Sequence, residues 1–126
     1  MTAAVFDAGG LISLEKGDRR MIAVADAVVN SRVSAYVPAG VVAQVWRGTP
    51  RQHDIAVLLR SEAVRVVPLD EGTARKIGLL LGASGQSDVT DAHVAYLAAS
   101  LGNAVVYTSD AADITAINPS LAIVPV

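Results

Sequence analysis

The stretch Ala3-Ala4-Val5-Phe6-Asp7-Ala8-Gly9-Gly10 places a run of apolar residues directly before an aspartate and a glycine pair. An uninterrupted apolar run of this length is typical of a strand that is buried on both faces of a parallel sheet. A carboxylate just past the end of such a strand contributes little to stability, but it is well placed to bind a divalent metal. The stretch therefore predicts a buried strand, Ala3–Phe6, that ends at a functional acid.

The rest of the chain repeats this alternation of apolar runs and helical segments. Further strands are predicted at Ser34–Val37, Val64–Val67, Ala104–Tyr107 and Ala122–Val124. Helices are predicted at Leu11–Leu14, Asp18–Asn30, Ala39–Trp46, Thr49 or Pro50 to Ser61, Asp70–Leu81, Asp88–Leu101 and Asp110–Ile117, with a loop at Gly82–Gln86. Strands that alternate with helices predict an α/β domain of three layers, α/β/α, in which helices cover both faces of a parallel sheet. We expect one domain over residues 1–126.

The composition excludes several classes of protein. The chain has 126 residues, 52% of them hydrophobic, and no cysteine, which excludes a disulfide framework and a thiolate zinc site. The absence of cysteine suits a reducing compartment, and we expect a cytoplasmic protein. The first residues lack a basic region before an apolar stretch, so we expect no signal peptide.

Neither a membrane span nor a strongly basic surface is indicated. The longest stretch without Asp, Glu, Lys or Arg, Ala92–Ser109, is interrupted by His93, Ser100 and the Gly102-Asn103 pair. This stretch is better explained by two short elements than by one membrane-spanning helix, because such a helix needs about 20 apolar residues. The net charge is −2, so a nucleic acid would have to be held by a local patch, a metal or a partner.

Two aspartates follow predicted strands. Asp7 follows the first strand and Asp110 the fourth. Ligands of parallel α/β sheets bind outside the carboxyl ends of the strands, so the two carboxylates would face each other if these strands are neighbours. The alternative is that each acid caps the helix that follows it. A third acid, Asp91, favours a metal site over capping alone.

Asp91 heads an otherwise apolar face of its predicted helix, which also carries Val94 and Ala98. A buried carboxylate without a partner is costly, so Asp91 should have one. A cation shared with Asp7 and Asp110 would supply it. Mutual repulsion of clustered carboxylates is relieved by a hard divalent cation, and an all-oxygen ligand set favours magnesium or manganese over zinc.

Two further acids have alternative roles. Asp88 lies three residues before Asp91 and is either the N-cap of that helix or a further metal ligand; it could do both. Asp113 lies three residues after Asp110, where a first-turn acid favoured by the helix dipole is the better interpretation than a metal contact.

Four segments resemble the PIN-domain family, specifically the VapC-type toxin ribonucleases. They are Val5-Phe6-Asp7-Ala8, Val37-Pro38-Ala39-Gly40-Val41-Val42-Ala43-Gln44-Val45-Trp46-Arg47, Asp91-Ala92-His93-Val94-Ala95 and Tyr107-Thr108-Ser109-Asp110-Ala111-Ala112-Asp113. The resemblance spans almost the whole chain and rests on the order, spacing and strand-end placement of these segments. It implies a parallel five-stranded sheet of order 3-2-1-4-5, with Asp7 and Asp110 on adjacent strands.

The resemblance also implies a function and its residues. It implies a magnesium-dependent endoribonuclease that acts on RNA, a homodimer, and a cognate antitoxin whose tail blocks the acidic pocket. Asp7, Asp91 and Asp110 match the metal-site aspartates of the family. Thr108 and Ser109 match its small hydroxyl residues, which orient a ligand or water.

One position departs from the family pattern. The family usually has a glutamate in the third helix, where this chain has Gln44. Glutamine offers a carbonyl oxygen but no charge, so Gln44 puts in question the metal affinity and the occupancy of a second metal position. Asp88 is a candidate to replace the missing carboxylate. The alternative to an active ribonuclease is therefore a catalytically weak PIN domain that binds its antitoxin or RNA.

The remaining candidates lie around the third helix and on two histidines. Arg47 and Arg51 are either phosphate contacts or ordinary surface arginines. Trp46 fits the core or a dimer interface better than a base-stacking platform. We expect His53 to be solvated and His93 to point away from Asp91, and we assign neither a catalytic role.

A phosphoacceptor receiver domain is a rival with the same layers. That fold needs an aspartate after its third strand and a lysine after its last one. Here Pro68-Leu69 follows the third strand and no lysine occurs after Lys76. The sequence therefore argues against a receiver domain.

Overall fold

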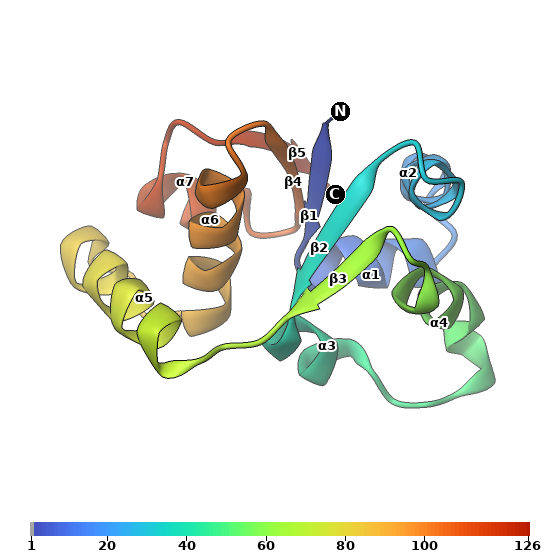
Figure 1. Ribbon diagram of the computed structural model, residues 1–126, viewed down its shortest axis with the longest axis horizontal. Coiled ribbons are helices and arrows are strands. Elements are labelled where there is room, and N and C mark those ends of the chain that lie inside the picture. Colours follow the sequence, from blue (N-terminus) through green and yellow to red (C-terminus); the bar gives the residue numbers. More distant parts are fainter. Residues whose placement is uncertain (1) are drawn as a thin grey trace.

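The strands form a single parallel sheet of order β3-β2-β1-β4-β5 in the computed structural model, which describes residues 2–126 (Figure 1). The strands are β1 (Ala3–Phe6), β2 (Ser34–Pro38), β3 (Val64–Val67), β4 (Ala104–Thr108) and β5 (Ala122–Pro125). The predicted α/β fold and its strand order 3-2-1-4-5 are confirmed. Met1, the first residue of the predicted single domain, lies outside the described residues.

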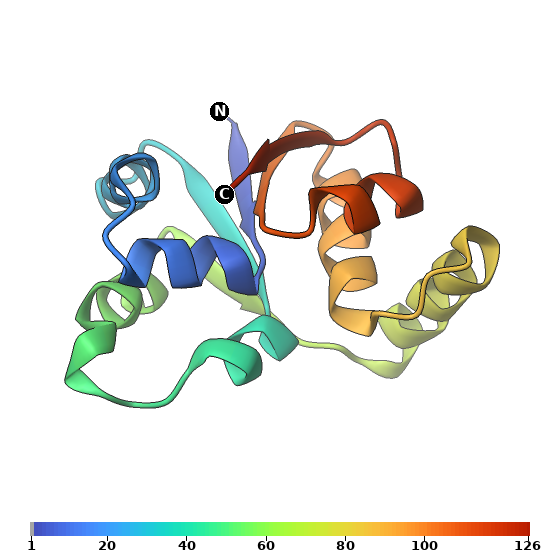
Figure 2. The same ribbon diagram turned by 180° about the vertical axis from the view of Figure 1, so that it is seen from behind.

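Helices cover both faces of the sheet (Figures 1 and 2). One side carries α1 (Ala8–Glu15), α2 (Arg19–Val29) and α4 (His53–Arg60), and the other carries α5 (Glu71–Ser84), α6 (Val89–Leu101) and α7 (Ala111–Ile117). The short helix α3 (Ala39–Val45) and the 3-10 turn η1 (Pro50–Gln52) lead from β2 to α4 along the edge where the strands end. Of the second group, α6 packs directly on the sheet and α5 packs on α6.

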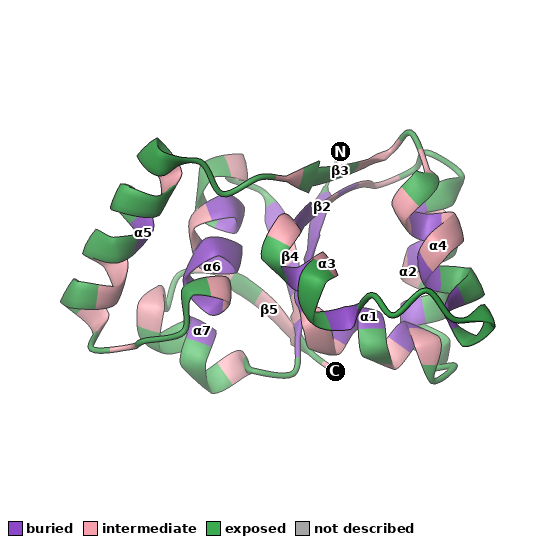
Figure 3. Ribbon diagram, turned by 90° about the horizontal axis from the view of Figure 1, so that it is seen from below, coloured by how far each residue is buried: buried purple, intermediate pink, exposed green. Residues whose placement is uncertain are grey.

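The core is centred on β1, the middle strand. All of β1 is buried, because β2 and β4 flank it and helices cover both of its faces. Helix α6 is buried from Asp91 to Ala98 except at Tyr96, whereas α5 is largely exposed (Figure 3). A continuous apolar strand beside a mostly apolar helix removes a large area from water, which is the main stabilising contribution in a domain of this size.

Some predicted boundaries were wrong for identifiable reasons. Helix α1 begins directly after Asp7 instead of at Leu11, because the glycine pair is part of its first turn. Helix α5 continues through Gly82 to Ser84, and it ends where Gly85 adopts a left-handed φ of 74°. A glycine inside a helix costs only about 1 kcal/mol, whereas left-handed backbone geometry ends a helix.

Among residues 2–126, every helix is too short or too polar to cross a lipid bilayer.

Candidate metal centre

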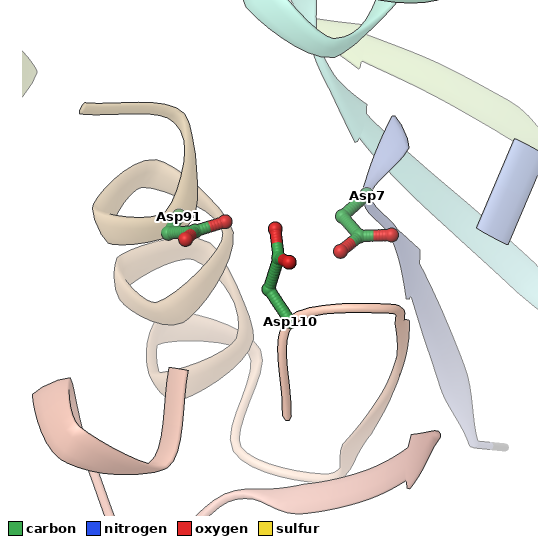
Figure 4. A group of neighbouring side chains, drawn as sticks. All are labelled: Asp7, Asp91 and Asp110. Carbon is green, nitrogen blue, oxygen red and sulfur yellow. The ribbon is translucent and has the colours of Figure 1, made fainter. Parts of the chain in front are cut away.

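The sheet order brings the two strand-end aspartates together. β1 and β4 pair in parallel with Phe6 opposite Tyr107, so Asp7 and Asp110 leave neighbouring strands at the same edge. Asp91 reaches this edge from the first turn of α6. One carboxylate oxygen from each of Asp7, Asp91 and Asp110 lies within 4.8 Å of the other two. Figure 4 shows the side chain of Asp110 between those of Asp91 and Asp7.

Asp7 is fixed by hydrogen bonds to both of its oxygens. Oδ1 accepts from the backbone N–H of Gly10 at 2.9 Å, which caps α1, and Oδ2 accepts from the hydroxyl of Thr108. The same hydroxyl oxygen accepts from the backbone N–H of Asp110 at 2.8 Å. Thr108 is fully buried and Asp7 nearly so. Asp7 therefore both caps α1 and belongs to the acidic group. The hydroxyl of Thr108 connects Asp7 to Asp110.

The glycine pair after Asp7 allows α1 to approach the end of β4. A Cβ on Gly9 would lie 2.1 Å from Ser109 Oγ and 2.8 Å from the Ser109 backbone nitrogen. A Cβ on Gly10 would lie 2.9 Å from the carbonyl oxygen of Tyr107. Any side chain at either position would push α1, and Asp7 at its start, away from β4. The two adjacent glycines in a first helical turn are the sequence signal for this close approach.

Burial and like charge both favour the protonated form of Asp91. Together they raise its pKa to about 7, with burial as the largest cause, followed by the nearby carboxylates of Asp88 and Asp110. Burial also raises the pKa of Asp7, although the Thr108 hydroxyl and the Gly10 N–H oppose this shift. Side chains that resist ionisation in isolation, and that carry oxygen ligands only, fit a hard divalent cation.

The other predicted acids have different positions. Asp110 occupies the N-cap position of α7, but its side chain makes no capping hydrogen bond. Asp88 caps α6 by accepting from the backbone N–H of Asp91 at 2.9 Å, and it is not a member of the group of three. Asp113 is exposed in the first turn of α7, as expected for an acid at a helix start.

The polar and basic candidates lie at the surface. Gln44 and Ser109 are exposed. Arg47 folds back on the end of α3, where its Nη1 donates to the carbonyl oxygen of Trp46 at 2.8 Å, and Arg51 is exposed in η1. Of the two expected places for Trp46, the core was wrong, because its side chain is 43% exposed at the C-terminal end of α3, and a dimer interface stays a prediction.

The sequence interpretation missed two buried polar side chains. Gln52 is 4% exposed, and its amide hydrogen-bonds to the backbone of the segment after α3. His93 is 3% exposed, and its Nε2 has no hydrogen-bond partner within residues 2–126. Burial lowers the pKa of His93. Gln52 lies in none of the segments that resemble the PIN family, and although His93 lies in one of them, periodicity did not predict that it is buried.

Comparisons with known proteins agree with this geometry. A family model described as PIN domain matches residues 4–116. The structure is similar to a chain of FitAB bound to an IR36 DNA fragment, with a TM-score of 0.64 and 16% identity over 97% of this chain and 94% of the other. It is also similar to a chain of VapBC2 from Rickettsia felis bound to a promoter DNA fragment, with a TM-score of 0.62 and 10% identity over 98% of both chains. FitAcB from Neisseria gonorrhoeae gives a TM-score of 0.58 and 18% identity over 95% of both chains. No curated protein matches the sequence.

The fold and the acidic group together define a class of protein. It has an open parallel α/β sheet and a candidate metal centre at the edge where the middle strands end. Because the family model covers most of its length, the chain belongs to the PIN-domain family. At identities of 10% to 18%, the solved structures establish the fold alone.

Proposed function

We propose that this protein is a metal-dependent endoribonuclease, the toxin of a type II toxin–antitoxin pair. The observation that carries the proposal is the convergence of Asp7, Asp91 and Asp110 within 4.8 Å in a PIN domain. Magnesium or manganese is the cofactor that fits these oxygen ligands. The carboxylate of Asp88 and the carbonyl of Gln44 are candidates for outer contacts.

The reaction is hydrolysis of an RNA phosphodiester bond. A bound divalent ion would supply Lewis-acid chemistry, because it stabilises negative charge on phosphoryl oxygens and lowers the pKa of water. Asp7, Asp91 and Asp110 would hold that ion. Thr108 keeps Asp7 and the start of α7 in register, so two of the three acids are oriented before any ligand binds. Ser109 and Asp113, which are exposed, are proposed as supporting polar groups, and Arg47 and Arg51 are proposed to contact RNA phosphates.

The partners are proposed by analogy with the structural relatives. FitAB and VapBC2 are complexes, and their structures contain DNA. By analogy, we propose a cognate antitoxin for this chain, assembly as a homodimer, and a site of action in the cytoplasm, where RNA substrates are present. No membrane partner is proposed.

A second function is favoured by Gln44. An uncharged side chain where the family usually has a glutamate reduces the negative charge available to a metal. A catalytically weak PIN domain that binds its antitoxin or RNA is the corresponding alternative.

A cleavage assay separates the two functions. Purified protein is incubated with labelled single-stranded RNA in magnesium, in manganese and in EDTA, beside the Asp7→Asn variant. Cleavage that needs a divalent metal and is lost in Asp7→Asn supports the ribonuclease. Equal RNA decay in all conditions, or in the variant, contradicts it, and RNA or antitoxin binding without any decay supports the binding module.

A further inference from the structure

The segment between α3 and α4 is held in shape by one buried side chain. Gln52 Oε1 accepts from the backbone N–H groups of Arg47 at 2.9 Å and Gly48 at 3.2 Å. Gln52 Nε2 donates to the carbonyl oxygen of Val45 at 2.8 Å. Trp46–Thr49, between α3 and η1, belongs to no helix or strand, so the glutamine amide supplies partners that regular structure would otherwise provide. The result is a loop with a defined conformation instead of a loose connection.

This ordered loop presents an aromatic ring and two positive charges to solvent. Trp46 is the single tryptophan of the chain and is 43% exposed. Arg47 is anchored through its hydrogen bond to the Trp46 carbonyl oxygen, which fixes the position of its charge without neutralising it. Arg51 forms no ion pair within residues 2–126, where the one salt bridge joins Arg75 to Glu71. An exposed aromatic beside unpaired basic groups is the combination that binds single-stranded nucleic acid.

The same segment borders a cavity beside α1. The cavity has a volume of about 470 Å³ and is lined by Glu15, Arg47, Thr49, Pro50, Arg51 and Gln52. Glu15 is the last residue of α1, and Asp7 is the cap at its start. Eight helical residues span about 12 Å, so the cavity lies one short helix away from the acidic group. Figure 2 shows the segment from α3 to α4 running alongside α1.

We propose that Trp46–Gln52 is a binding site for the single strand of RNA that flanks the acidic group. Trp46 stacks on an unpaired base, Arg47 and Arg51 contact phosphates, and Gln52 is a positioning residue that fixes the loop. The inference rests on the proposed function only in taking RNA as the ligand. Stacking on Trp46 requires an unpaired base, because bases inside a duplex are stacked on one another.

The single tryptophan provides a direct test. The wild-type protein is titrated in EDTA with a uridine oligonucleotide of about ten residues, while the emission of Trp46 is recorded. We expect saturable quenching by the oligonucleotide and much weaker quenching by duplex RNA of equal length. An unchanged emission overturns the proposal. A change in Trp46 emission that depends on protein concentration, and not on RNA concentration, also overturns the proposal. That result would assign Trp46 to a contact between copies of the chain. Because EDTA prevents metal-dependent cleavage, this result is independent of whether the protein is a nuclease.

Charge variants test the phosphate contacts. Arg51→Gln should weaken binding of the oligonucleotide about 3- to 10-fold and reduce the slope of log affinity against log salt by about 0.7, the value for one phosphate on a single strand. Glu15→Gln should tighten binding, because it removes a negative charge from the cavity wall. Arg60→Gln is the matched control, since Arg60 is exposed in the last turn of α4 and lines a different cavity. Equal effects of Arg51→Gln and Arg60→Gln would overturn the assignment.

Gln52 is tested by separating binding from chemistry. Gln52→Met keeps the length of the side chain and removes its three hydrogen bonds, so we expect a raised KM for RNA, an unchanged kcat and an unchanged affinity for magnesium. Gln86→Met is the control at a glutamine in another loop. If Gln52→Met fails to fold, Gln52→Glu replaces it, because a carboxylate still accepts from the two N–H groups but cannot donate to Val45. Unchanged RNA affinity in the folded variant contradicts the positioning role.

Discussion

The hydroxyl of Thr108 donates a hydrogen bond to Asp7 Oδ2, which joins the last residue of β4 to the residue that follows β1. The same oxygen accepts from the N–H of Asp110, so one buried side chain organises two strand-end acids. A hydroxyl is suited to this place because it is both a donor and an acceptor. A substitution of Thr108 should therefore change the orientation of the Asp7 carboxylate.

The first prediction concerns this hydroxyl. Thr108→Val preserves shape but leaves the buried Asp7 oxygen and the Asp110 N–H without partners, which should cost about 1–3 kcal/mol of unfolding free energy. Urea denaturation in EDTA measures this difference. Thr108→Ser should retain most of the stability, and equal stability of Thr108→Val and wild type would contradict the role of the hydroxyl.

The second prediction is that the metal-free protein is more stable at pH 5 than at pH 8. The pKa of Asp91 is raised from 3.8 to about 7 on folding, so the native state holds its proton more tightly than the unfolded state. The stability contributed by this proton is fully present below pH 3.8 and is lost as the pH rises through about 7. Unfolding in EDTA at several pH values measures the loss.

Asp91→Asn is the control for this pH dependence. The amide cannot ionise, so the variant should be more stable than wild type at pH 8 by roughly 2–4 kcal/mol. Its stability should also change less between pH 5 and pH 8. A variant with the same pH profile as wild type would show that Asp91 is not the titrating group.

The third prediction concerns metal binding and its pH dependence. Ligation requires deprotonated carboxylates, so magnesium competes with the protons held by Asp91 and Asp7. Magnesium should therefore raise the melting temperature more at pH 8 than at pH 6, and EDTA should reverse the increase. Thermal scans with matched ionic strength measure this. A magnesium effect that is equal at both pH values, or that persists in Asp7→Asn, would contradict binding at these acids.

The fourth prediction addresses the departure from the family pattern. Gln44→Glu adds a carboxylate on the exposed side of α3, and we expect it to tighten magnesium binding. Titration calorimetry measures the affinity, with Gln86→Glu as a control for added charge elsewhere. Unchanged or weaker binding in Gln44→Glu would show that this position does not contribute to the metal centre.

The fifth prediction compares two glycines. Gly9→Ala should destabilise the protein by about 1–3 kcal/mol, because its Cβ would meet the side chain and backbone nitrogen of Ser109. Gly78→Ala should stabilise it by about 0.5–1 kcal/mol, since Gly78 is exposed inside α5 with no atom within 4 Å of a Cβ. Chemical denaturation of both variants tests the pair, and a neutral Gly9→Ala would argue against close approach of α1 and β4.

The sequence predicted the structure correctly where a residue pattern indicates both the local element and its place in the fold. Ala3–Phe6 could be predicted as a buried strand because it is continuously apolar, and Asp18 and Asn30 were correctly placed at the ends of α2. Asp7 and Asp110 were grouped because strand ends share an edge in a parallel sheet, and Asp91 was added because a carboxylate on an apolar helix face needs a partner. Gln52 was missed because its partners are backbone groups of an irregular loop, whose positions depend on tertiary structure.

The way the acidic group is assembled has a consequence for fragments of the protein. Asp7 directly follows the first strand of the chain, whereas Asp91 lies in α6 and Asp110 directly precedes α7. A cut at the exposed Gly85, between α5 and α6, would leave one acid in the first fragment and two in the second. Neither fragment alone should reproduce the proposed metal site, and mixing them should restore it only if β4 re-pairs with β1. Complementation of this kind would make the metal centre a reporter of correct sheet assembly.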